Sequence, residues 1–268
     1  MIRKRFDMLQ KTIDAVKRAA DFMVTDGFSI ERKGSVVNIV TSSDVAVQNY
    51  LCKELARIIP GCGFYCEEEN VHDPDKEYVW VIDPIDGTAN YARGIDACCI
   101  SVALRHAGET VLGVVYSPAR NELYYAERGS GAWMNGKRIH ASGRSFKESI
   151  LCTAMSIYRK EYAQTCSDII MDTFFQANDV RRFGSAALEL CFLARGLCEL
   201  FFEMRLQPWD YAAGILIAEE AGGVVSSLDG RSPRYDGPDL ICGGNNAENH
   251  SKFLGIVRKH LDSIPYID

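Results

Sequence analysis

The residues best suited to chemistry lie in the segment VWVIDPIDGTANY. A hydrophobic run, expected to form a strand, ends at Asp83, and Asp86 follows three residues later. Two carboxylates at the mouth of a sheet could hold a hard divalent cation through their oxygens. Gly87 permits a tight turn, so the backbone amides of Gly87 and Thr88 could face a phosphate. An ordinary polar turn is the alternative, and Asp-Pro or Asp-Gly alone would indicate nothing more.

Further acidic side chains lie far from this segment along the chain. Glu67, Glu68 and Glu69 are consecutive in GFYCEEEN, and Asp210 lies in the first turn of an apolar helix in PWDYAAGILIAEEAGG. Taken singly, the glutamates are typical of a solvated charge run, and Asp210 of an acid at a helix N-terminus. Two bare charges about 4 Å apart repel by about 4 kcal/mol at an effective dielectric near 20. A site that gathers Glu67 and Asp210 with the two aspartates of the first segment therefore needs divalent cations.

The charge of the chain supports the same requirement. Lys and Arg number 30 against 36 Asp and Glu, a net charge of −6, and no basic block could neutralise a run of phosphates. Nucleic acid is therefore not an expected partner. Hydrophobic residues make up 47% and charged residues 25%, as in globular proteins. An anionic substrate would need a positive field that bound cations can supply.

The first half of the chain should supply helices and antiparallel strands. Apolar residues at steps of three and four predict an N-terminal helix, and a second helix follows VTSSD, where Ser42, Ser43 or Asp44 could cap it. The apolar face of this second helix comprises Val47, Leu51, Leu55 and Ile58. Extended segments follow at 78–83, 97–106 and 110–118, then in ELYYAE and AWMNGKRIH, with Asn135-Gly136 as a hairpin turn.

From about residue 150, strands alternate with longer helical stretches. Helices are expected near 159–177, after Gly184-Ser185, from Pro208 to Gly222-Gly223 and at the end of the chain. We therefore predict an α+β lobe over 1–148 with an antiparallel sheet and most of the candidate metal ligands, and an α/β lobe over 149–268 that supplies Asp210 and substrate contacts. Without a flexible linker between them, the two lobes should share an interface.

Location and cysteine usage give two weaker expectations. The N-terminus lacks the apolar core of a signal peptide, and no apolar run approaches the ~20 residues that span a bilayer. The protein is therefore expected in the cytoplasm, with no membrane partner. The ten cysteines fit no common disulfide or zinc spacing, so small buried hydrophobic residues are the favoured interpretation.

Four segments together carry a resemblance to a known family. VTSSD, CEEEN, DPIDGTANY and WDYAAGILIAEEAGG occur in the order and approximate spacing of the inositol monophosphatase family. Each short piece is weak, but DPIDGT followed by WD-x-AAG-x-x-x-x-x-EAGG is highly specific, and the resemblance extends over nearly the whole chain. It implies a layered α-β-α-β-α sandwich and Mg²⁺-dependent hydrolysis of a phosphate monoester.

The resemblance also implies two Mg²⁺ ions. Glu67, Asp83 and the carbonyl of Ile85 would hold one ion, and Asp83, Asp86 and Asp210 the second, with Asp83 as the bridge. Glu67 would also touch a third, weaker ion. Two metals of this kind stabilise the attacking and bridging oxygens of an in-line displacement.

Other positions would prepare the attacking water. Asp44 would pair with the hydroxyl of Thr88, which with Glu67 would orient and deprotonate the water molecule that attacks phosphorus. Lys33 and Glu68 would support the surrounding network. By spacing alone, Lys33 could be any surface lysine.

The implied substrate contacts come from both lobes. They are Asp86, Gly87, Thr88, Ser185, Ala186, Glu203 and Asp210. The turn before Ala186 would lie beside the polyol, although helix capping alone would also explain its sequence. Glu203 would hydrogen-bond ring hydroxyls, whereas a glutamate at a strand end is otherwise usually solvated.

Four departures from the family pattern leave the implied ligands intact. Cys66 replaces the commoner glycine, Glu69 is additional, Asn38 stands where many members have aspartate, and Arg205 replaces a frequent glycine. An added guanidinium near the polyol could favour a second phosphate on the substrate.

Several functions stay open at this point. A small phosphorylated polyol or sugar is the expected substrate, with myo-inositol monophosphate first. Fructose 1,6-bisphosphate and 3′-phosphoadenosine nucleotides are rivals within the same chemistry. A non-catalytic Ca²⁺-binding module is the rival outside it, although no EF-hand-like ligand ladder is present. Kinship further suggests a homodimer and sensitivity to Li⁺.

Overall fold

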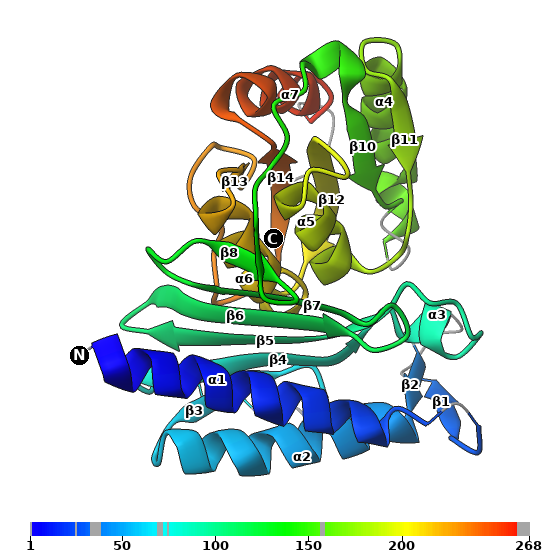
Figure 1. Ribbon diagram of the computed structural model, residues 1–268. Coiled ribbons are helices and arrows are strands. Elements are labelled where there is room, and N and C mark those ends of the chain that lie inside the picture. The colour runs from blue at the N-terminus through cyan, green and yellow to red at the C-terminus, as the bar shows by residue number, and fades with distance from the viewer. Residues whose placement is uncertain are drawn as a thin grey trace.

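The computed structural model shows five stacked layers of helices and sheets (Figure 1). It describes residues 2–24, 26–32, 39–68, 72–73, 75–155 and 159–261, with backbone alone for 2–6. From bottom to top in the figure, the layers are helices α1 and α2, a seven-stranded sheet, helices α5 and α6, a five-stranded sheet, and helices α4 and α7. The layered α-β-α-β-α sandwich implied by the resemblance is confirmed.

The two helices of the first layer pack their apolar faces on the larger sheet. Helix α1 spans Ile2–Ala19 and α2 spans Ser42–Ile58. In α2, Val47, Leu51 and Leu55 are fully buried, as predicted. The predicted caps Ser42, Ser43 and Asp44 lie inside the helix instead.

The residue that caps α2 is Thr41. It is extended, and its side chain and the carboxylate of Asp44 accept from each other's backbone N–H in a capping box. The prediction missed this cap because it did not consider the reciprocal pair of Thr41 and Asp44, which determines where the helix begins.

The larger sheet has strand order β3-β4-β5-β6-β7-β8-β9. Its strands are β3 Gly63–Cys66, β4 Tyr78–Asp86, β5 Cys99–His106, β6 Glu109–Ser117, β7 Glu122–Glu127, β8 Ala132–Met134 and β9 Lys137–Ile139. All neighbours are antiparallel except β3 and β4. Asn135 and Gly136 both have positive φ in the predicted hairpin turn. A two-stranded ribbon, β1 Ile30–Arg32 with β2 Ile39–Thr41, and the short helix α3 Thr88–Tyr91 were not predicted.

Strand β4 does not end at Asp83, so that prediction was wrong. It continues to Asp86, and its register against β5 shifts between these two aspartates. Such a bulge lets a strand re-aim side chains without leaving the sheet. Both aspartates are therefore held by strand pairing, since Asp83 lies opposite Ser101 and Asp86 opposite Cys99.

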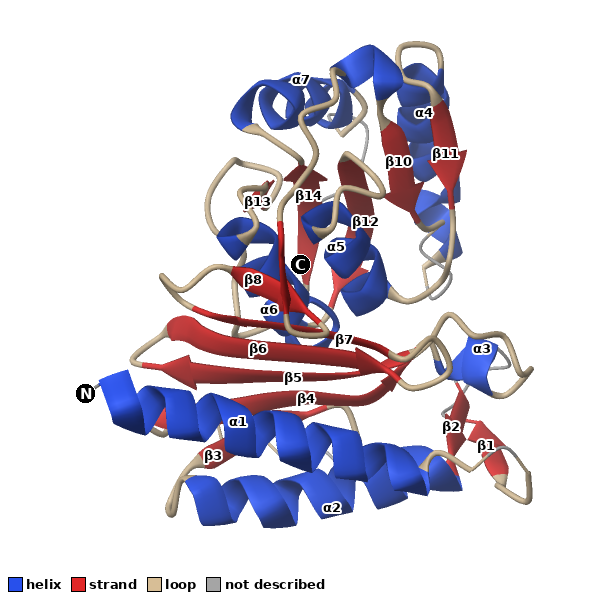
Figure 2. Cartoon of the chain, in the orientation of Figure 1, coloured by secondary structure: helices blue, strands red, loops and turns tan. Residues whose placement is uncertain are grey.

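The smaller sheet has strand order β11-β10-β12-β14-β13. Its strands are β10 Ile150–Thr153, β11 Asp179–Arg181, β12 Leu200–Leu206, β13 Val224–Ser226 and β14 Asp239–Gly244. Helices α4 Ala163–Phe174 and α7 Ala247–Lys259 cover its outer face, and α5 Ala186–Ala194 and α6 Pro208–Glu220 lie between the two sheets (Figure 2). Sheet β10–β14 and its helices agree with the α/β pattern predicted for the second half.

Three apolar clusters fill the spaces between the layers. The first includes Val16 and Leu51 under the larger sheet, and the third includes Phe202 and Phe253 under α4 and α7. The second surrounds α5 and α6, which are buried almost all round between the sheets. Because this middle cluster joins the two halves of the chain, the division at residue 148 stays a prediction.

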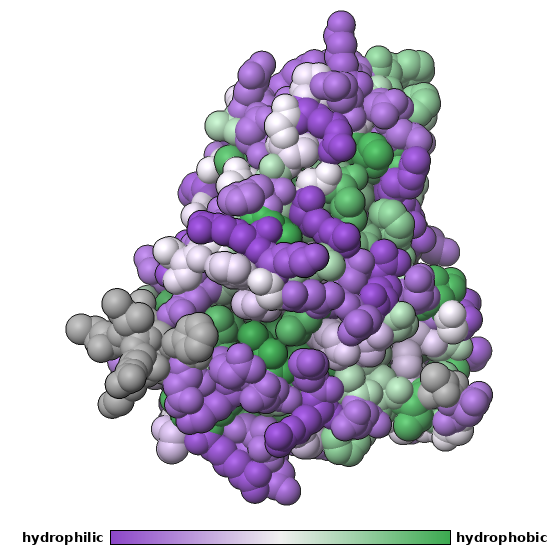
Figure 3. All heavy atoms as spheres, viewed as in Figure 1, coloured by the Kyte–Doolittle hydropathy of each residue, from purple (hydrophilic) through white to green (hydrophobic). Residues whose placement is uncertain are grey.

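One face of the molecule is mostly hydrophilic (Figure 3). An open hollow of about 510 Å³ lies between α1 and the strands beside it, with Lys17, Tyr116 and Tyr125 among its lining residues. The acidic residues of the predicted site do not line it. Of the described helices, none combines the length and the hydrophobicity needed to cross a lipid bilayer.

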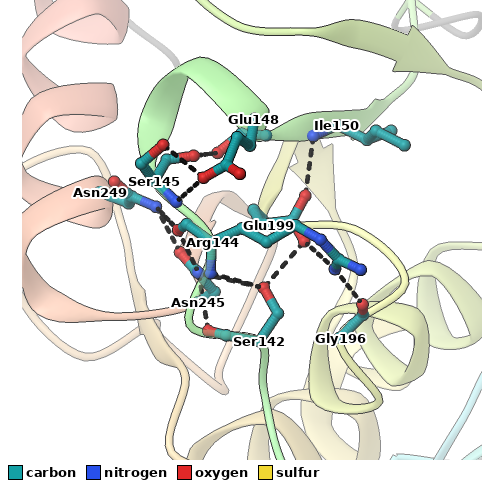
Figure 4. A network of polar contacts seen from close by, with 10 residues as sticks. Ser142, Arg144, Ser145, Glu148, Ile150, Gly196, Glu199, Asn245 and Asn249 are labelled. Carbon is teal, nitrogen blue, oxygen red and sulfur yellow. Dashed lines mark hydrogen bonds and ion pairs between the residues drawn. The ribbon is translucent and has the colours of Figure 1, made fainter.

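A polar network fixes the segment that joins the two sheets (Figure 4). The buried carboxylate of Glu199 accepts from Ser142 Oγ at 2.8 Å, from Arg144 Nη1 at 2.9 Å and from the backbone N–H of Ile150 at 2.9 Å. Asn245 donates to the backbone oxygens of Ser142 and Arg144. The connection therefore holds the start of β10 against the loop before β12.

Candidate active site

Glu67 follows β3 directly, and the parallel pairing of β3 with β4 places it beside the aspartates. Cys66 lies opposite Ile82, and the backbone N–H of Glu67 donates to the Ile82 carbonyl at 3.1 Å. The next peptide is held from α2, because the side-chain amide of Gln48 accepts from Glu68 N at 2.9 Å and donates to Glu68 O at 2.8 Å. Residues Glu67 and Glu68 are thus fixed by two elements at once.

Asp210 reaches the same place from the other half of the chain. It lies in the first turn of α6, where its backbone N–H donates to the Gln207 carbonyl and its carboxylate accepts from Gln207 N at 2.7 Å. The hydroxyl of Ser101, opposite Asp83 in the sheet, donates to the Trp209 carbonyl at 3.3 Å. This contact ties the start of α6 to the strand that faces Asp83.

The charges of these acids act on one another in the folded chain. Burial raises the pKa of Asp83 well above its usual range, and the charges of Glu67, Asp86, Asp210 and Asp44 raise it further. Burial of its carboxylate also raises the pKa of Asp210, and Asp86 and Glu67 add to the effect. A shift of this kind marks a charge that the folded chain alone does not neutralise.

Asp86 bridges the two halves of the chain. Its Oδ2 accepts from Ser185 Oγ at 2.7 Å and from Ala187 N at 2.7 Å, at the N-terminus of α5. No side chain of α5 itself caps this helix, so Asp86 acts as its N-cap from another element. Burial raises the pKa of Asp86 to about 6, against the lowering effect of the hydrogen bonds from Ser185, Ala187 and their neighbours.

The predicted pair of Asp44 and Thr88 is formed. Thr88 Oγ1 lies 3.1 Å from Asp44 Oδ1 and 2.9 Å from the carbonyl oxygen of Ile85. The hydroxyl has one hydrogen, so these two acceptors share it. Burial raises the pKa of Asp44, while hydrogen bonds from Thr41 and Thr88 lower it.

Gly87 is the point at which three segments of backbone meet. Its φ is +88°, and a Cβ on it would lie 2.9 Å from the Ala97 carbonyl oxygen, 3.2 Å from the Gly184 oxygen and 3.3 Å from Ser185 Cβ. Only glycine fits this conformation and this space. The turn after Asp86 and the turn before α5, both predicted to contact substrate, therefore lie directly against each other.

Strand β12 carries two of the positions named from the sequence, Glu203 and Arg205. Glu203 is buried on β12, where burial and then the charges of Glu189, Asp86 and Asp210 raise its pKa. The solvated alternative for this glutamate does not apply. Arg205, two residues on, has φ of 60° where the β12–β14 register shifts, a left-handed conformation that usually favours glycine.

The donor set fits Mg²⁺. Asp83 Oδ1 is buried and, among the described residues, has no hydrogen-bond partner, so it has an unused lone pair where an ion would bind. The cluster offers carboxylate oxygens and the Ile85 carbonyl, which are hard ligands.

The cluster is not a closed metal cage. Within the described ranges, no three His, Cys, Asp or Glu side chains are spaced to hold one ion by themselves. Mg²⁺ commonly binds through one or two carboxylates and completes its shell with water and substrate phosphate. The set of three carboxylates on a second ion stays a prediction that requires these side chains to approach each other.

Three positions named from the sequence, Lys33, Asn38 and Glu69, lie outside the described residues. Conversely, Gln48 and Glu189 were not predicted as site residues. A lone glutamate in the otherwise apolar helix AALELCFLA was a usable signal for Glu189, since a charge is rarely buried without a partner. The contact of Gln48 with Glu68 depends on tertiary packing and leaves no local pattern.

Comparison with known proteins decides the family. The sequence pattern described as Inositol monophosphatase family matches residues 3–262. The chain belongs to the inositol monophosphatase family. Among relatives of this family, an inositol-1-monophosphatase of Mesorhizobium japonicum is 35% identical over 245 residues, covering 91% of each chain. A protein named Nus factor SuhB of Salmonella typhimurium is 40% identical over 214 residues, covering 79% of this chain and 80% of the relative.

Solved structures of inositol monophosphatases have the same fold. An enzyme of this type from Thermotoga maritima superposes with a TM-score of 0.85 at 30% identity, covering 99% of this chain and 100% of the other. An IMPase/NADP phosphatase at 25% identity and TM-score 0.78, covering 92% and 91% of the two chains, is complexed with Mg²⁺ and phosphate. The structure of SaIMPase-II at 26% identity and TM-score 0.77, covering 98% and 95%, has inositol monophosphate bound.

Proposed function

We propose that this protein is a Mg²⁺-dependent phosphatase that hydrolyses the phosphate monoester of a small polyol or sugar, with myo-inositol monophosphate as the first candidate. The observation that carries the proposal is the group of acidic side chains around Asp83, whose buried Oδ1 has no partner among the described residues. Membership of the family and relatives that bind Mg²⁺, phosphate or inositol monophosphate support it.

The proposed metal ligands are Glu67, Asp83, the Ile85 carbonyl, Asp86 and Asp210. Mg²⁺ bound there would neutralise the repulsion among the carboxylates, attract the phosphate and activate a water molecule for attack. Asp83 is the proposed bridge between two ions. Asp86 can bind the second ion with Oδ1, because its Oδ2 already accepts hydrogen bonds from Ser185 and Ala187.

Thr88, Asp44 and Glu67 would prepare the attacking water. When the Thr88 hydroxyl donates to Asp44 Oδ1, its lone pairs can accept from the water and fix its direction. Glu67 would then take part in removing the proton. Asp44 is itself held by Thr41, so it keeps the Thr88 hydroxyl oriented rather than contacting the phosphate.

The proposed substrate contacts surround the meeting point at Gly87. They are Asp86, Gly87, Thr88, Ser185, Ala186, Glu203 and Asp210. Glu203, buried and facing other acids, would accept hydrogen bonds from hydroxyl groups of a polyol. Hydroxyl-rich substrates would supply hydrogen-bond donors to these carboxylates.

Phosphate release from a substrate panel tests the proposal. We expect hydrolysis of inositol 1-phosphate with Mg²⁺, loss of activity on chelation, and little activity with Ca²⁺ in place of Mg²⁺. Fructose 1,6-bisphosphate and 3′-phosphoadenosine 5′-phosphate separate the two rival substrates. If inositol 1-phosphate is not hydrolysed while another compound is turned over rapidly, that compound replaces it as the proposed substrate. If no monoester is hydrolysed, the enzyme is refuted in favour of a Ca²⁺-binding module.

Identity to a Nus factor favours a second candidate function. The 40% identity to the Salmonella typhimurium protein supports a role in transcription in addition to, or instead of, hydrolysis. Co-purification of the wild-type chain with transcription elongation complexes tests it, with Asp83→Asn as a companion. Retention of both proteins on the complexes would support a role independent of catalysis, and failure of both to bind would exclude it.

We also propose a homodimer and inhibition by Li⁺, both on the basis of kinship. Sedimentation of the purified chain checks the first, and a Li⁺ titration of Mg²⁺-dependent phosphate release checks the second. A monomer at micromolar concentration or unchanged activity in Li⁺ would contradict the respective proposal.

A further inference from the structure

A buried glutamate that the proposed mechanism does not use lies on α5. Glu189 is fully buried, and it is the one charged residue in the helix sequence AALELCFLA, whose other residues are also buried. Burying a carboxyl group among apolar side chains is costly unless it makes specific hydrogen bonds. An apolar residue would be buried here at a lower cost in free energy, so the role of Glu189 must come from its specific contacts.

One oxygen of Glu189 holds the turn that precedes α5. Its Oε1 accepts from the backbone N–H of Phe183 at 2.7 Å and from that of Gly184 at 2.9 Å. From the opposite side, Asn90 of α3 donates to the Phe183 carbonyl at 2.7 Å and to the Ala97 carbonyl at 2.7 Å. The turn is therefore held by a side chain from each half of the molecule.

The other oxygen of Glu189 takes no part in these hydrogen bonds. Its Oε2 is buried and, in the part of the chain that the structure describes, lacks a hydrogen-bond partner. Glu189 is also the charge that acts most strongly on Glu203. The charge of Glu189 therefore acts on the residue proposed to contact the polyol.

The turn that Glu189 holds contacts a proposed metal ligand and a proposed substrate-binding residue. The Gly184 carbonyl lies against Gly87, and Ser185 donates to Asp86 at 2.7 Å. A shift of the turn would therefore move an anchor of Asp86 and one wall of the substrate pocket together. The backbone of Asp86 would stay in β4, paired with Cys99, while its carboxylate would lose a fixed partner.

We propose that Glu189 is a positioning residue, which fixes the Phe183–Ser185 turn so that Ser185, Asp86 and Gly87 are held in the geometry that binds the phosphorylated substrate. This inference rests on the proposed phosphatase activity, because that activity defines the substrate that the turn would help to bind. Glu189 would affect the affinity for the substrate rather than the rate of the chemical step.

Kinetics of matched variants test this role. Glu189→Ala removes the acceptor for both amides, and we expect KM to rise by about tenfold or more, while kcat changes by less. Glu189→Gln keeps an oxygen that can accept from both amides, so it should restore KM to within about threefold of wild type. Glu199→Ala and Glu199→Gln are the controls, since Glu199 is a buried glutamate that also accepts a backbone N–H but lies in the network of Figure 4.

Amide hydrogen exchange gives a measurement that does not depend on turnover. In Glu189→Ala, the amides of Phe183 and Gly184 should exchange at least about tenfold faster than in wild type, whereas Glu199→Ala should leave them unchanged. If no monoester is hydrolysed by wild type, the proposed function fails, and exchange still decides whether Glu189 holds the turn. Unchanged exchange and KM in Glu189→Ala, or equal KM changes in Glu189→Ala and Glu199→Ala, would overturn the proposal.

Discussion

At the scale of single residues, the central acid of the site is held by the backbone hydrogen bonds of its strand, and one of its side-chain oxygens is left unpaired among the described residues. Asp83 is fixed through its backbone opposite Ser101, and its Oδ1 is left without a partner among the described residues. Asp86 differs, because two donors of α5 occupy one of its oxygens. Two aspartates of one strand are thus prepared for different tasks by their surroundings.

Asp83→Asn should separate activity from stability. We expect kcat to fall by roughly 10³-fold or more, because several kcal/mol of transition-state stabilisation depend on metal binding at this position. The fold should remain, and the metal-free variant should melt at the same or a higher temperature than metal-free wild type, since one repelling charge is gone. Phosphate release and thermal melting measure the two effects.

Asp179→Asn, at a half-buried acid of β11, serves as the control, and it should leave phosphate release close to wild type. A near-normal rate for Asp83→Asn would contradict the bridging role. A large loss of folded protein would show that the carboxylate has a structural role instead.

Thr88→Ser and Thr88→Val test the hydroxyl that Asp44 orients. We expect Thr88→Val to lower kcat by about 10²- to 10⁴-fold, because the attacking water loses its partner. Thr88→Ser keeps the hydroxyl and should retain most of the rate. Equal rates for the two variants in steady-state kinetics would exclude a catalytic role for the hydroxyl.

At the scale of elements, the acids are positioned by contacts between neighbours in space rather than along the chain. Helix α2 holds the Glu67–Glu68 peptide through Gln48, and α5 is capped by Asp86 of β4. The first turn of α6 is tied to β5 through Ser101. Helices α2, α5 and α6 are therefore each attached to a strand of the larger sheet or to the residues directly after one.

Gln48→Ala should weaken Mg²⁺ binding without touching a ligand. Removing the amide leaves the N–H and carbonyl of Glu68 buried without their partner, which should lower the free energy of unfolding by about 1–3 kcal/mol. Because Glu67 then loses its fixed position, a higher Mg²⁺ concentration should be needed for half-maximal activity. Gln10→Ala on the exposed side of α1 is the control, and identical Mg²⁺ dependence in the two variants would contradict the effect.

The sequence allowed most elements near the site to be predicted, because their signals are local. The apolar spacing of α2, the length of ELYYAE and the Asn135-Gly136 turn are visible without tertiary information. The extension of β4 through Asp86 could not be predicted, since Pro84 normally breaks a ladder and the bulge depends on pairing with β5. The cap at Thr41 was missed because four successive polar residues offered equivalent local choices.

At the scale of the whole molecule, the site lies where the two halves of the chain meet. Helices α5 and α6 share one apolar cluster with both sheets, and their N-terminal turns contact the strand ends that carry the acids. Family resemblance, rather than residue spacing, predicted that Asp210 would join Asp83. Spacing alone could not do so, because the distance between them in space depends on the packing of α6 against β5.

Metal binding should change how stability depends on pH. The raised pKa values of Asp83, Asp86 and Asp210 mean that the folded metal-free chain keeps protons that the unfolded chain loses. The free energy of unfolding without metal should therefore fall as pH rises from about 4 through about 6 and above. Mg²⁺ binds the ionised form, so the rise in Tm on adding Mg²⁺ should be larger near pH 7.5 than near pH 5.

Thermal melting with and without Mg²⁺ at both pH values measures this effect. Taking the difference removes the opposite contribution of His250, whose pKa burial lowers. An equal rise in Tm at both pH values would show that the acids do not bind the ion in their ionised form.

The capping of α5 by Asp86 has a consequence for the synthesis of the chain. On the ribosome, Asp83 and Asp86 emerge about one hundred residues before the donors at Ser185 and Ala187, and Asp210 emerges later still. A nascent chain released early would thus carry most of the acids but lack the partners that fix them. The ability to bind metal should appear abruptly, only when the last third of the protein has been translated.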